Sequence, residues 1–336
     1  MFDLRHFIHT VEASVAAHNL GQPGAYRRWT EIGDPKGLRG TGINPYGCAD
    51  AANILYTIGR FPGDPGDRQD WISVLQGLQN PETGLFEEPT HHPIHTTAHC
   101  LAALELFEAR PRYPLKELND LRQTHNLSAF LESLDWRYNP WNESHRGAGL
   151  YAALVLAGEA NLEWEERYFT WLWEEFDPQT GLLRKGRIRA VKAGEEVSIF
   201  PHLAGTFHYL FNLEYARRAL RYPERLVDTC LEIYQGKTFP LGEQISFSEI
   251  DWVYCLNRAV RQSGHRFGEA RAALLDLAGR YTHFLMSIDP ETDPDFDDLH
   301  RLFGAVCCLA ELQQALPGII RTQRPLKLVL DRRPFI

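Results

Sequence analysis

The chain has 336 residues, 44% of them hydrophobic and 12% aromatic, a composition that can build an extended core and an aromatic-lined cavity. Its 35 basic and 44 acidic side chains give a net charge of −9, which argues against a nucleic-acid-binding protein. No apolar run approaches the length of a membrane span, and charges interrupt residues 1–15, so we expect neither a transmembrane segment nor a signal peptide.

Six polar or aromatic residues each open a run of small and apolar residues, at intervals of 49 to 57 residues. In chain order they are Tyr46, His95, His145, His202, Asp251 and His300. Because the runs lack a wide charged stripe, each predicts a helix that is buried on most of its circumference. A period of about 50 residues is typical of a repeat architecture.

More polar segments with a helical apolar period lie between these runs. They span residues 2–18, 68–79, 115–134, 162–176, 223–235 and 267–288. Buried helices that alternate with amphipathic ones predict an all-α protein, an (α/α)6 toroid with six inner helices around an axis and six outer helices packed on them. We expect a single domain over residues 1–336, built from six helical hairpins of about 50 residues each.

One insertion interrupts the repeat. The longest interval precedes His202, and its alternating pattern with glycines predicts a short β-hairpin over residues 184–200. Elsewhere, Pro with Gly or Asp marks turns after outer helices, as in NPETGLF (80–86) and DPQTGLL (177–183).

All inner helices of such a ring run in the same direction, so their N-termini gather at one mouth together with the six opening residues. Helix N-termini carry partial positive charge and free N–H groups, which favour anionic groups. We therefore expect a pocket at this mouth, lined by histidines from equivalent positions of the repeat. The alternative is that each opening residue caps a helix or is a hydrogen-bonded core histidine.

The segment WISVLQGLQNPETGLFEEPTHHPIHTTAHCLAALELF (71–107) resembles the repeat shared by squalene cyclases and the β subunits of protein prenyltransferases. In that repeat an outer helix ends in a Gln-rich turn, which is followed by Gly, an aromatic residue and an inner helix that begins with His. Residues 171–213 resemble it in part. The resemblance implies an α/α toroid with a central hydrophobic cavity. It leaves the activity open, because glycoside hydrolases, polysaccharide lyases and epimerases use the same architecture.

The sequence Asp295-Phe296-Asp297-Asp298 resembles the DxDD motif of class II terpenoid cyclases and stands immediately before the last inner helix. This resemblance implies an isomerase in which Asp297 protonates a polyprenyl substrate while Asp295 and Asp298 tune its acidity. Neighbouring carboxylates favour a shared proton, and a helix dipole steadies the anion left after transfer. We expect His300 to hydrogen-bond to this cluster. Aromatic side chains that would stabilise carbocations are Tyr46, Phe200, Phe207, Trp252, Tyr254 and Phe303.

Two features set limits on the cyclase hypothesis. Leu299 follows the motif where the family usually has Thr, and the surrounding run DPETDPDFDD could equally form a solvated loop that caps a helix. We expect no cofactor. The alternative is zinc held by Asp251, Cys255 and His300, residue types that resemble the zinc ligands of prenyltransferase β subunits. The Asp and Cys of that family are two residues apart, whereas here they are four apart.

A carbohydrate-active enzyme, either a glycoside hydrolase, a polysaccharide lyase or an epimerase, is the second functional hypothesis. Its stacking surfaces and polar groups would come from Tyr46, Asp50, Trp136, Tyr138, Trp141, His145, His202, Glu249 and Asp251. Glycoside hydrolysis needs two carboxyl groups about 5–10 Å apart, for which Asp50 with Asp251 or Glu249 is the candidate pair. The basic residues Arg184, Lys185, Arg187, Arg189 and Lys192 could hold a uronate or sulfate.

A non-catalytic binding protein is the third hypothesis, since a toroid without activity would show the same repeat. For all three, the expected ligand is a small molecule, polyprenyl or glycan, and peripheral contact with a membrane is left open. The residues expected to bind it are Tyr46, Asp50, His95, His145, His202, Phe207, Asp251 and Trp252. Six cysteines, mostly inside the apolar runs, indicate reduced core thiols in a cytoplasmic protein.

Overall fold

The computed structural model describes residues 1–34, 36–188 and 198–334. In this part of the chain there are 13 α-helices, three short 3₁₀ helices and one sheet of two short strands. The prediction of an all-α protein is therefore confirmed.

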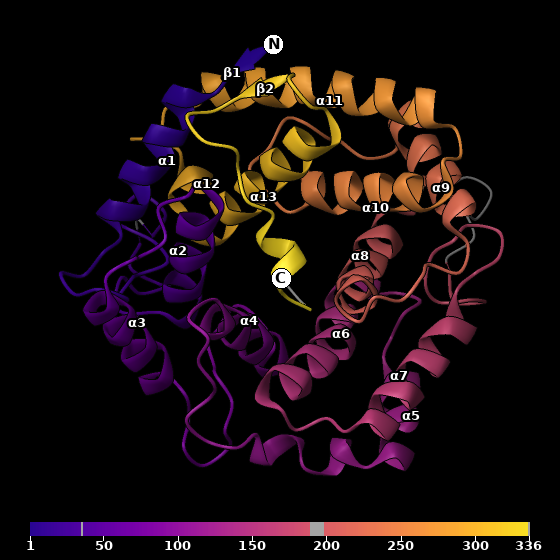
Figure 1. The fold of residues 1–336 in the computed structure, drawn as a ribbon, viewed down its shortest axis with the longest axis horizontal. Coiled ribbons are helices and arrows are strands. Elements are labelled where there is room, and N and C mark those ends of the chain that lie inside the picture. Colours follow the sequence, from indigo (N-terminus) through magenta and orange to yellow (C-terminus); the bar gives the residue numbers. More distant parts are fainter. Residues whose placement is uncertain (35, 189–197, 335–336) are drawn as a thin grey trace.

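Six helices surround the centre of the molecule in Figure 1. They are α2 (Pro45–Thr57), α4 (Pro93–Leu106), α6 (Pro140–Ala157), α8 (Phe200–Tyr215), α10 (Ser248–Ser263) and α13 (Leu299–Ala315). Each of these helices packs against the next one along the chain, and α13 packs against α2. The six apolar runs of the sequence thus form one continuous layer of helices around the centre.

Six further helices lie outside this layer (Figure 1). They are α1 (Arg5–Ala17), α3 (Pro65–Gly77), α5 (Thr124–Ser133), α7 (Leu162–Glu175), α9 (Pro223–Gly236) and α11 (Phe267–Ser287). Helix α3 packs on α2 and α4, α9 packs on α10, and α11 packs on α10 and α13. The amphipathic segments of the sequence therefore cover the buried helices, as their one-sided apolar period predicts.

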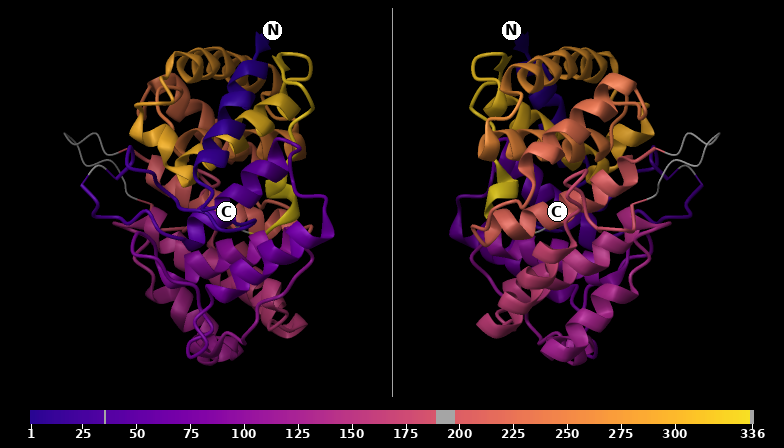
Figure 2. Two further views of the ribbon diagram at one scale, coloured as in Figure 1. Left: turned by 90° about the vertical axis from the view of Figure 1, so that its left-hand side faces the viewer. Right: turned by 90° about the vertical axis from the view of Figure 1, so that its right-hand side faces the viewer.

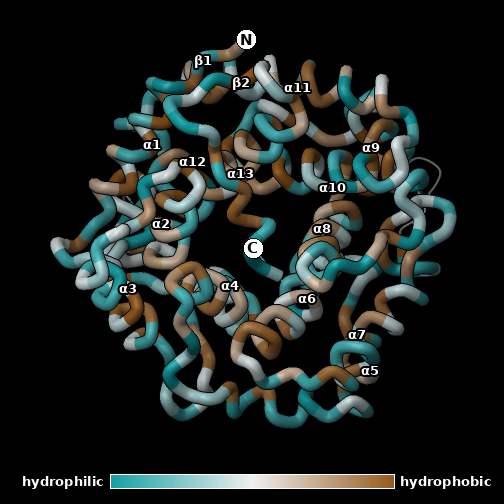
Figure 3. Tube along the Cα trace, viewed as in Figure 1, coloured by the Kyte–Doolittle hydropathy of each residue, from teal (hydrophilic) through white to brown (hydrophobic). Residues whose placement is uncertain are grey.

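The difference in burial between the two sets is large. In α4 every residue except Pro93 and Glu105 is buried, whereas in α3 the buried residues are Trp71 and Leu75. Figure 3 shows hydrophobic residues recurring along the inner helices, while hydrophilic residues predominate in the peripheral loops. A helix that is apolar all round needs neighbours on every side, and the second layer supplies them.

The beginnings of the inner helices are marked by local sequence signals. Proline stands in the first turn of α2, α4, α6 and α8, where its missing N–H costs no hydrogen bond. The side chain of Asn44 caps α2 by accepting from the N–H groups of Tyr46 and Gly47, and Asp298 caps α13 by accepting from the N–H of His300. These caps fix Tyr46 and His300 in first turns.

One predicted helix is wrong in extent. Residues 115–134 were expected to form a single outer helix, but they form the 3₁₀ helices η1 (Lys116–Leu118) and η2 (Asp120–Arg122) before α5. The backbone N–H groups of Leu115 and Glu117 donate to the Glu159 side chain and to the carbonyl of Thr83, so other segments hold this backbone. Of the β-hairpin predicted over 184–200, residues 184–188 form turns and Phe200 begins α8, while the middle lies outside the described residues.

Segments near the two ends of the chain pair with each other and pack on the helices. Strand β1 (Phe2–Asp3) pairs in parallel with β2 (Ile320–Arg321), and Figure 2 shows α1 on the outside close to this C-terminal segment. The 3₁₀ helix η3 (Val329–Arg332) then contacts α2 and α8, and it lies near the centre of the molecule in Figure 1. A search of the described helices finds none that is both long and apolar enough to cross a membrane.

Candidate functional site

A cavity of about 390 Å³ opens where the inner helices begin. Its lining comes from the first turns of α4, α6 and α13, from the segments before α2, α4 and α10, and from the middle of α8. Five of the lining residues are histidines, namely His91, His95, His145, His208 and His300. The other lining residues are Arg28, Trp141, Asn142, Gln244, Ser246, Phe247 and Arg301. Among the described residues no carboxylate lines this cavity.

The imidazoles of the cavity lie close together, and burial holds four of them, His95, His145, His208 and His300, in the neutral form. Burial lowers the pKa of His208 and of His300 to about 3, and it lowers the pKa of His95 and His145 well below the usual value. Each ring also lowers the pKa of its neighbours, because two imidazolium ions at this spacing would repel each other. Neutral imidazole offers one N–H donor and one lone pair, so these rings present unprotonated nitrogen to the cavity.

A buried carboxylate orients His300. Asp50 lies behind the cavity wall, and its Oδ1 accepts from Nδ1 of His300 at 3.2 Å and from Nε2 of His99 at 2.8 Å. Arg333, from the C-terminal segment, donates to Nδ1 of His99 at 2.8 Å, which fixes the tautomer of that ring. These contacts keep Asp50 ionised, with a pKa below the usual value despite its burial. In His300, Nδ1 therefore carries the proton and Nε2 keeps the lone pair.

A second imidazole is held in a similar way. Nδ1 of His91 lies 2.9 Å from Oε1 of Glu88, a side chain that is almost fully buried. Glu88 also accepts from the N–H of Thr90 at 3.0 Å and from the Thr90 hydroxyl, and its hydrogen bonds with His91 and with that hydroxyl lower its pKa. The ring centroids of His91 and His300 are 5.1 Å apart. Two carboxylate-oriented imidazoles thus stand next to each other at the cavity.

Arginine side chains at the cavity are paired with acids. Arg28 donates from Nε and Nη2 to the two oxygens of Asp298, at 2.8 and 3.0 Å, and from Nη1 to Thr90 at 2.8 Å. Arg301, at the exposed rim, donates to Asp295. Two of the three carboxylates that the sequence predicted to be catalytic, Asp295 and Asp298, therefore neutralise the cavity's two arginines.

The three carboxylates of the predicted DxDD motif have separate surroundings, and the structure does not bring them together as a shared acid. Asp295 is exposed and pairs with Arg301, while Asp298 caps α13 and binds Arg28. Asp297, at the end of α12 (Pro294–Asp297), is buried and accepts from the N–H of Thr30 at 2.8 Å, the hydroxyl of Thr30 at 2.6 Å and the N–H of Gly33 at 2.9 Å. Asp297 is not among the residues that line the cavity.

His300 was expected to bond to this acidic cluster through its side chain. Its backbone N–H does donate to Asp298, but its imidazole turns instead to Asp50. The sequence did not predict Asp50 as the partner of the His300 imidazole, because Asp50 lies 250 residues away in the chain.

The predicted substrate-binding residues divide into three groups. His95 and His145 line the cavity, as His300 does. Tyr46 and Asp50 lie directly behind it, since the Tyr46 hydroxyl bonds to Nδ1 of His95. The others are buried in helix contacts away from the lining, namely His202, Phe207, Asp251 and Trp252.

The predicted zinc ligands are not brought together. Asp251 and Cys255 lie on the part of α10 that approaches Cys230 of α9, and Trp252 donates from Nε1 to the carbonyl of Cys230 at 2.8 Å. His300 is grouped with Asp50 and His99 instead. The alternative of zinc at Asp251, Cys255 and His300 is therefore not supported by the geometry.

The predicted glycosidase carboxylates are separated in the same way. Asp50 lies behind the cavity, while Glu249 accepts from the N–H of Gly242 at 2.9 Å and from the hydroxyl of Ser246 at 3.0 Å. Burial raises the pKa of Asp251 well above the usual value and the pKa of Glu249 to about 7. These two acids form a buried pair on α10 that does not line the cavity.

The raised pKa of Glu249 predicts a pH-dependent stability. A carboxyl with a higher pKa in the folded than in the unfolded state stabilises the fold at low pH, and this stability is lost as the pH rises from about 4.5 to about 7. We compare the free energies of unfolding of Glu249→Gln and of the unmodified chain. The difference between them should shift in favour of Glu249→Gln by about 2 kcal/mol as the pH rises from 5 to 8. Urea unfolding of both proteins at the two pH values measures this difference. An equal difference at both pH values would contradict the raised pKa.

Of the other residues proposed for carbohydrate binding, Trp141 lines the cavity and the rest that the structure describes lie outside its lining. Trp136 is buried against Tyr209, and Tyr138 is exposed, whereas Trp141 lines the cavity. Within the basic stretch, Arg184 is buried and paired with Glu132 and Glu175. Lys185 donates to the carbonyl of Glu174, and Arg189 and Lys192 lie outside the described residues.

Several residues of the site were missed by sequence reasoning, namely Arg28, Glu88, His91, His99, His208 and Arg333. A signal existed for His99, because His95 and His99 are four residues apart in HHPIHTTAH and so share one face of α4; His91 stands before that helix begins. Arg28 and Arg333 come from a loop and from the C-terminal segment, and their positions depend on contacts over the whole chain.

Comparison with protein-family models, with curated protein sequences and with solved structures gives no match to this chain.

Proposed function

We propose that this chain is a single-domain (α/α)6 toroid and a carbohydrate-active enzyme, with histidines rather than paired carboxylates as its catalytic groups. The closed packing order of the inner helices and the outer position of α1, α3, α5, α7, α9 and α11 support the toroid. The six buried, unpaired cysteines support a reducing cytoplasmic environment.

The composition of the cavity lining supports a sugar-like ligand. Planar polar side chains such as those of Asn142 and Gln244, with the hydroxyl of Ser246, can donate to and accept from hydroxyl groups. Trp141 and Phe247 offer aromatic faces on which the apolar side of a sugar ring can stack. A volume of about 390 Å³ lies in the range of small-molecule sites.

One observation carries the proposal: two imidazoles, each oriented by a buried carboxylate, stand side by side at this cavity. His300 is held by Asp50 and His91 by Glu88, with 5.1 Å between ring centroids. In such a pair the carboxylate fixes the tautomer and stabilises the imidazolium that forms when the ring takes a proton. His300, with its Nε2 lone pair, is the general base that we assign, and His91 is the general acid.

The reaction class follows from these groups. A neutral base and an acid close to each other suit proton transfer at carbon, as in a sugar epimerase or a lyase that eliminates next to a uronate carboxylate. Glycoside hydrolysis has less support, since the carboxylates of this region are committed to other partners. A class II terpenoid cyclase also has less support, because Asp297 is bound by Thr30 and Gly33 and the cavity is lined by bases that would take a proton from a carbocation.

The proposal is tested by exchange with deuterated solvent. We expect the protein to incorporate deuterium into at least one member of a panel of aldoses, ketoses, uronates and uronate-containing oligosaccharides, observed by NMR as loss of a C–H signal. We expect His300→Gln to lower this rate by at least about 100-fold, because a general base is removed. His283→Gln, which changes an exposed histidine of α11, is the matched control and should react as the unmodified chain does. Binding of a sugar without any exchange would instead favour a binding protein, and full exchange by His300→Gln would exclude the assigned base.

A further inference from the structure

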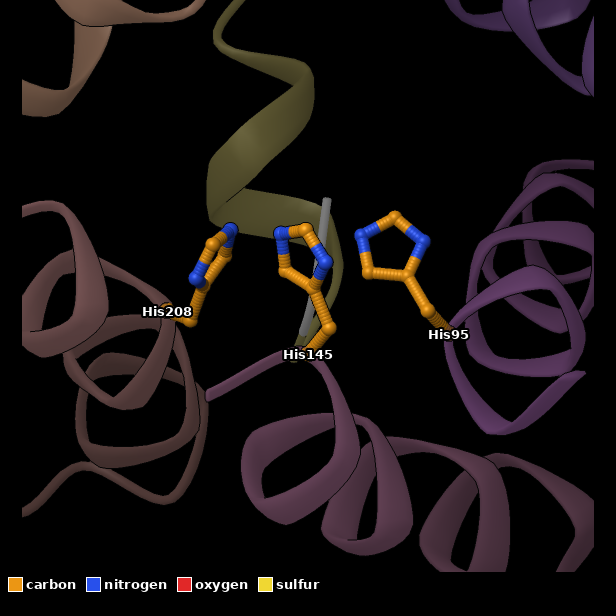
Figure 4. Close-up of side chains that lie close together, drawn as sticks. All are labelled: His95, His145 and His208. Carbon is orange, nitrogen blue, oxygen red and sulfur yellow. The ribbon is translucent and has the colours of Figure 1, made fainter. Parts of the chain in front are cut away.

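Three histidines from consecutive inner helices meet at one side of the cavity. His95 comes from α4, His145 from α6 and His208 from α8, and one ring nitrogen of each lies within 4.8 Å of the others. The ring centroid of His145 lies 4.2 Å from that of His95 and 4.7 Å from that of His208. Figure 4 shows the three imidazoles in a row, each projecting from its own helix into the same space.

Hydrogen bonds behind these rings set which nitrogen faces the common space. The Ser144 hydroxyl donates to the carbonyl of Trp141, so its oxygen accepts from Nδ1 of His208 at 2.8 Å. His208 then keeps its lone pair on Nε2. The hydroxyl of Tyr46 bonds to Nδ1 of His95 and fixes the orientation of that ring. Metal-binding histidines typically use their second ring nitrogen in this manner.

We propose that His95, His145 and His208 bind one divalent transition-metal ion, with Zn²⁺ as the ion that fits best. Three imidazole ligands and an open fourth position towards a cavity are the usual arrangement of a catalytic zinc. Around a tetrahedral zinc, nitrogens are about 3.3 Å apart, so ring nitrogens that lie within 4.8 Å of one another need to close by up to about 1.5 Å. The cavity beside His145 leaves space for an oxygen of water or of a ligand at the fourth position.

A second group of ligand-type side chains at the same mouth has a different arrangement. In Asp50, His99 and His300, both imidazoles direct an N–H to the same carboxylate oxygen, and Arg333 occupies the other nitrogen of His99. The ring nitrogens that face Asp50 are therefore used as donors, and Nδ1 of His99 is used as an acceptor from Arg333, all within one hydrogen-bonded network. This contrast makes the proposal specific, because metal binding should depend on His145 and His208 and not on His99.

The metal site goes beyond the proposed sugar chemistry and does not depend on it. When bound, the ion would supply a Lewis acid for an oxygen of the ligand. The test therefore uses binding and not turnover. It uses the full chain without a histidine tag, freed of metal by a chelator, titrated with ZnCl₂ in a calorimeter and with Co²⁺ in an absorption spectrometer.

We expect one equivalent of Zn²⁺ to bind with a Kd below about 1 µM, and Co²⁺ to give the intense visible bands of a tetrahedral site. His145→Gln and His208→Gln should each weaken binding by at least about 100-fold, and Ser144→Ala by about 10-fold or more through the orientation of His208. His99→Gln and the exposed control His283→Gln should bind as the unmodified chain does. His145 lies at the half-buried rim, so His145→Gln is expected to keep the fold, which its melting temperature checks. Absence of binding tighter than about 100 µM, or equal affinity in the His145 and His208 variants, would overturn the proposal.

Discussion

Replacing Arg258 by methionine is expected to lower the free energy of unfolding by about 3–5 kcal/mol. Arg258 lies in α10 and donates from Nε and Nη2 to the two oxygens of Glu311 in α13, both at 3.0 Å. Its Nη2 also reaches Asp331 of η3 at 2.6 Å. Because Glu311 is 1% exposed, the substitution leaves a buried carboxylate without its countercharge. The residue thus ties two inner helices and the C-terminal segment together.

Urea unfolding of Arg258→Met and of the double variant Arg258→Met with Glu311→Met measures this effect. The double variant should recover much of the lost stability, because both buried charges are then removed. Arg5→Met is the surface control, since the pair of Arg5 with Asp3 is exposed, and we expect it to change little. A single variant as stable as the unmodified chain would contradict the role of the buried pair.

Asp297→Asn is expected to lower the free energy of unfolding by about 3 kcal/mol and, with it, the melting temperature. The carboxylate accepts three hydrogen bonds from Thr30 and Gly33, and asparagine would turn an N–H₂ group towards some of these donors. Gly33 has no space for a side chain, since a Cβ there would lie 2.6 Å from Oδ2 of Asp297. Gly33→Ala should therefore destabilise the same contact.

Thermal unfolding followed by circular dichroism compares these variants. Asp295→Asn is the matched control, because Asp295 is exposed and its loss should leave the melting temperature nearly unchanged. An Asp297→Asn protein that melts with the unmodified chain would contradict the structural role of Asp297 and return the DxDD motif to consideration as a proton donor.

The helical layers could be predicted because burial leaves a clear trace in the sequence. Segments without a charged stripe became inner helices, and segments with a one-sided apolar period became outer helices. Residues 115–123 were the exception, because other segments hold the start of this stretch, Leu115 through Glu159 and Glu117 through Thr83, and it forms 3₁₀ turns in place of the predicted α-helix. Contacts of this kind join distant parts of the chain and have no local signal.

The site could be predicted only in part, for a related reason. His95, His145 and His300 were singled out because each opens an apolar run at a nearly constant interval, and all three line the cavity. On a helix that is buried all round, however, the sequence does not tell which face points inwards. Trp252 on α10 was expected to bind the ligand, but it faces α9. His208, in the middle of α8, lines the cavity although it was not predicted to do so.

Short motifs were the least reliable guide. The pattern Asp295-Phe296-Asp297-Asp298 fits an acid cluster, but its chemistry depends on the partners of each carboxylate. Those partners are Arg28, Thr30 and Gly33, which lie more than 260 residues earlier in the chain. They turn two of the three acids into anchors for the loop before α2.

We propose that catalysis by this protein depends on the histidine-lined cavity and not on the acidic motif beside it. The most direct test is the rate of deuterium incorporation per folded molecule, measured in parallel for His300→Gln and Asp297→Asn with the same sugar substrate. We expect the rate of deuterium incorporation to fall by at least about 100-fold in His300→Gln. In Asp297→Asn the rate per folded molecule should stay within a few-fold of that of the unmodified chain. Loss of turnover in Asp297→Asn together with retention in His300→Gln would contradict this proposal.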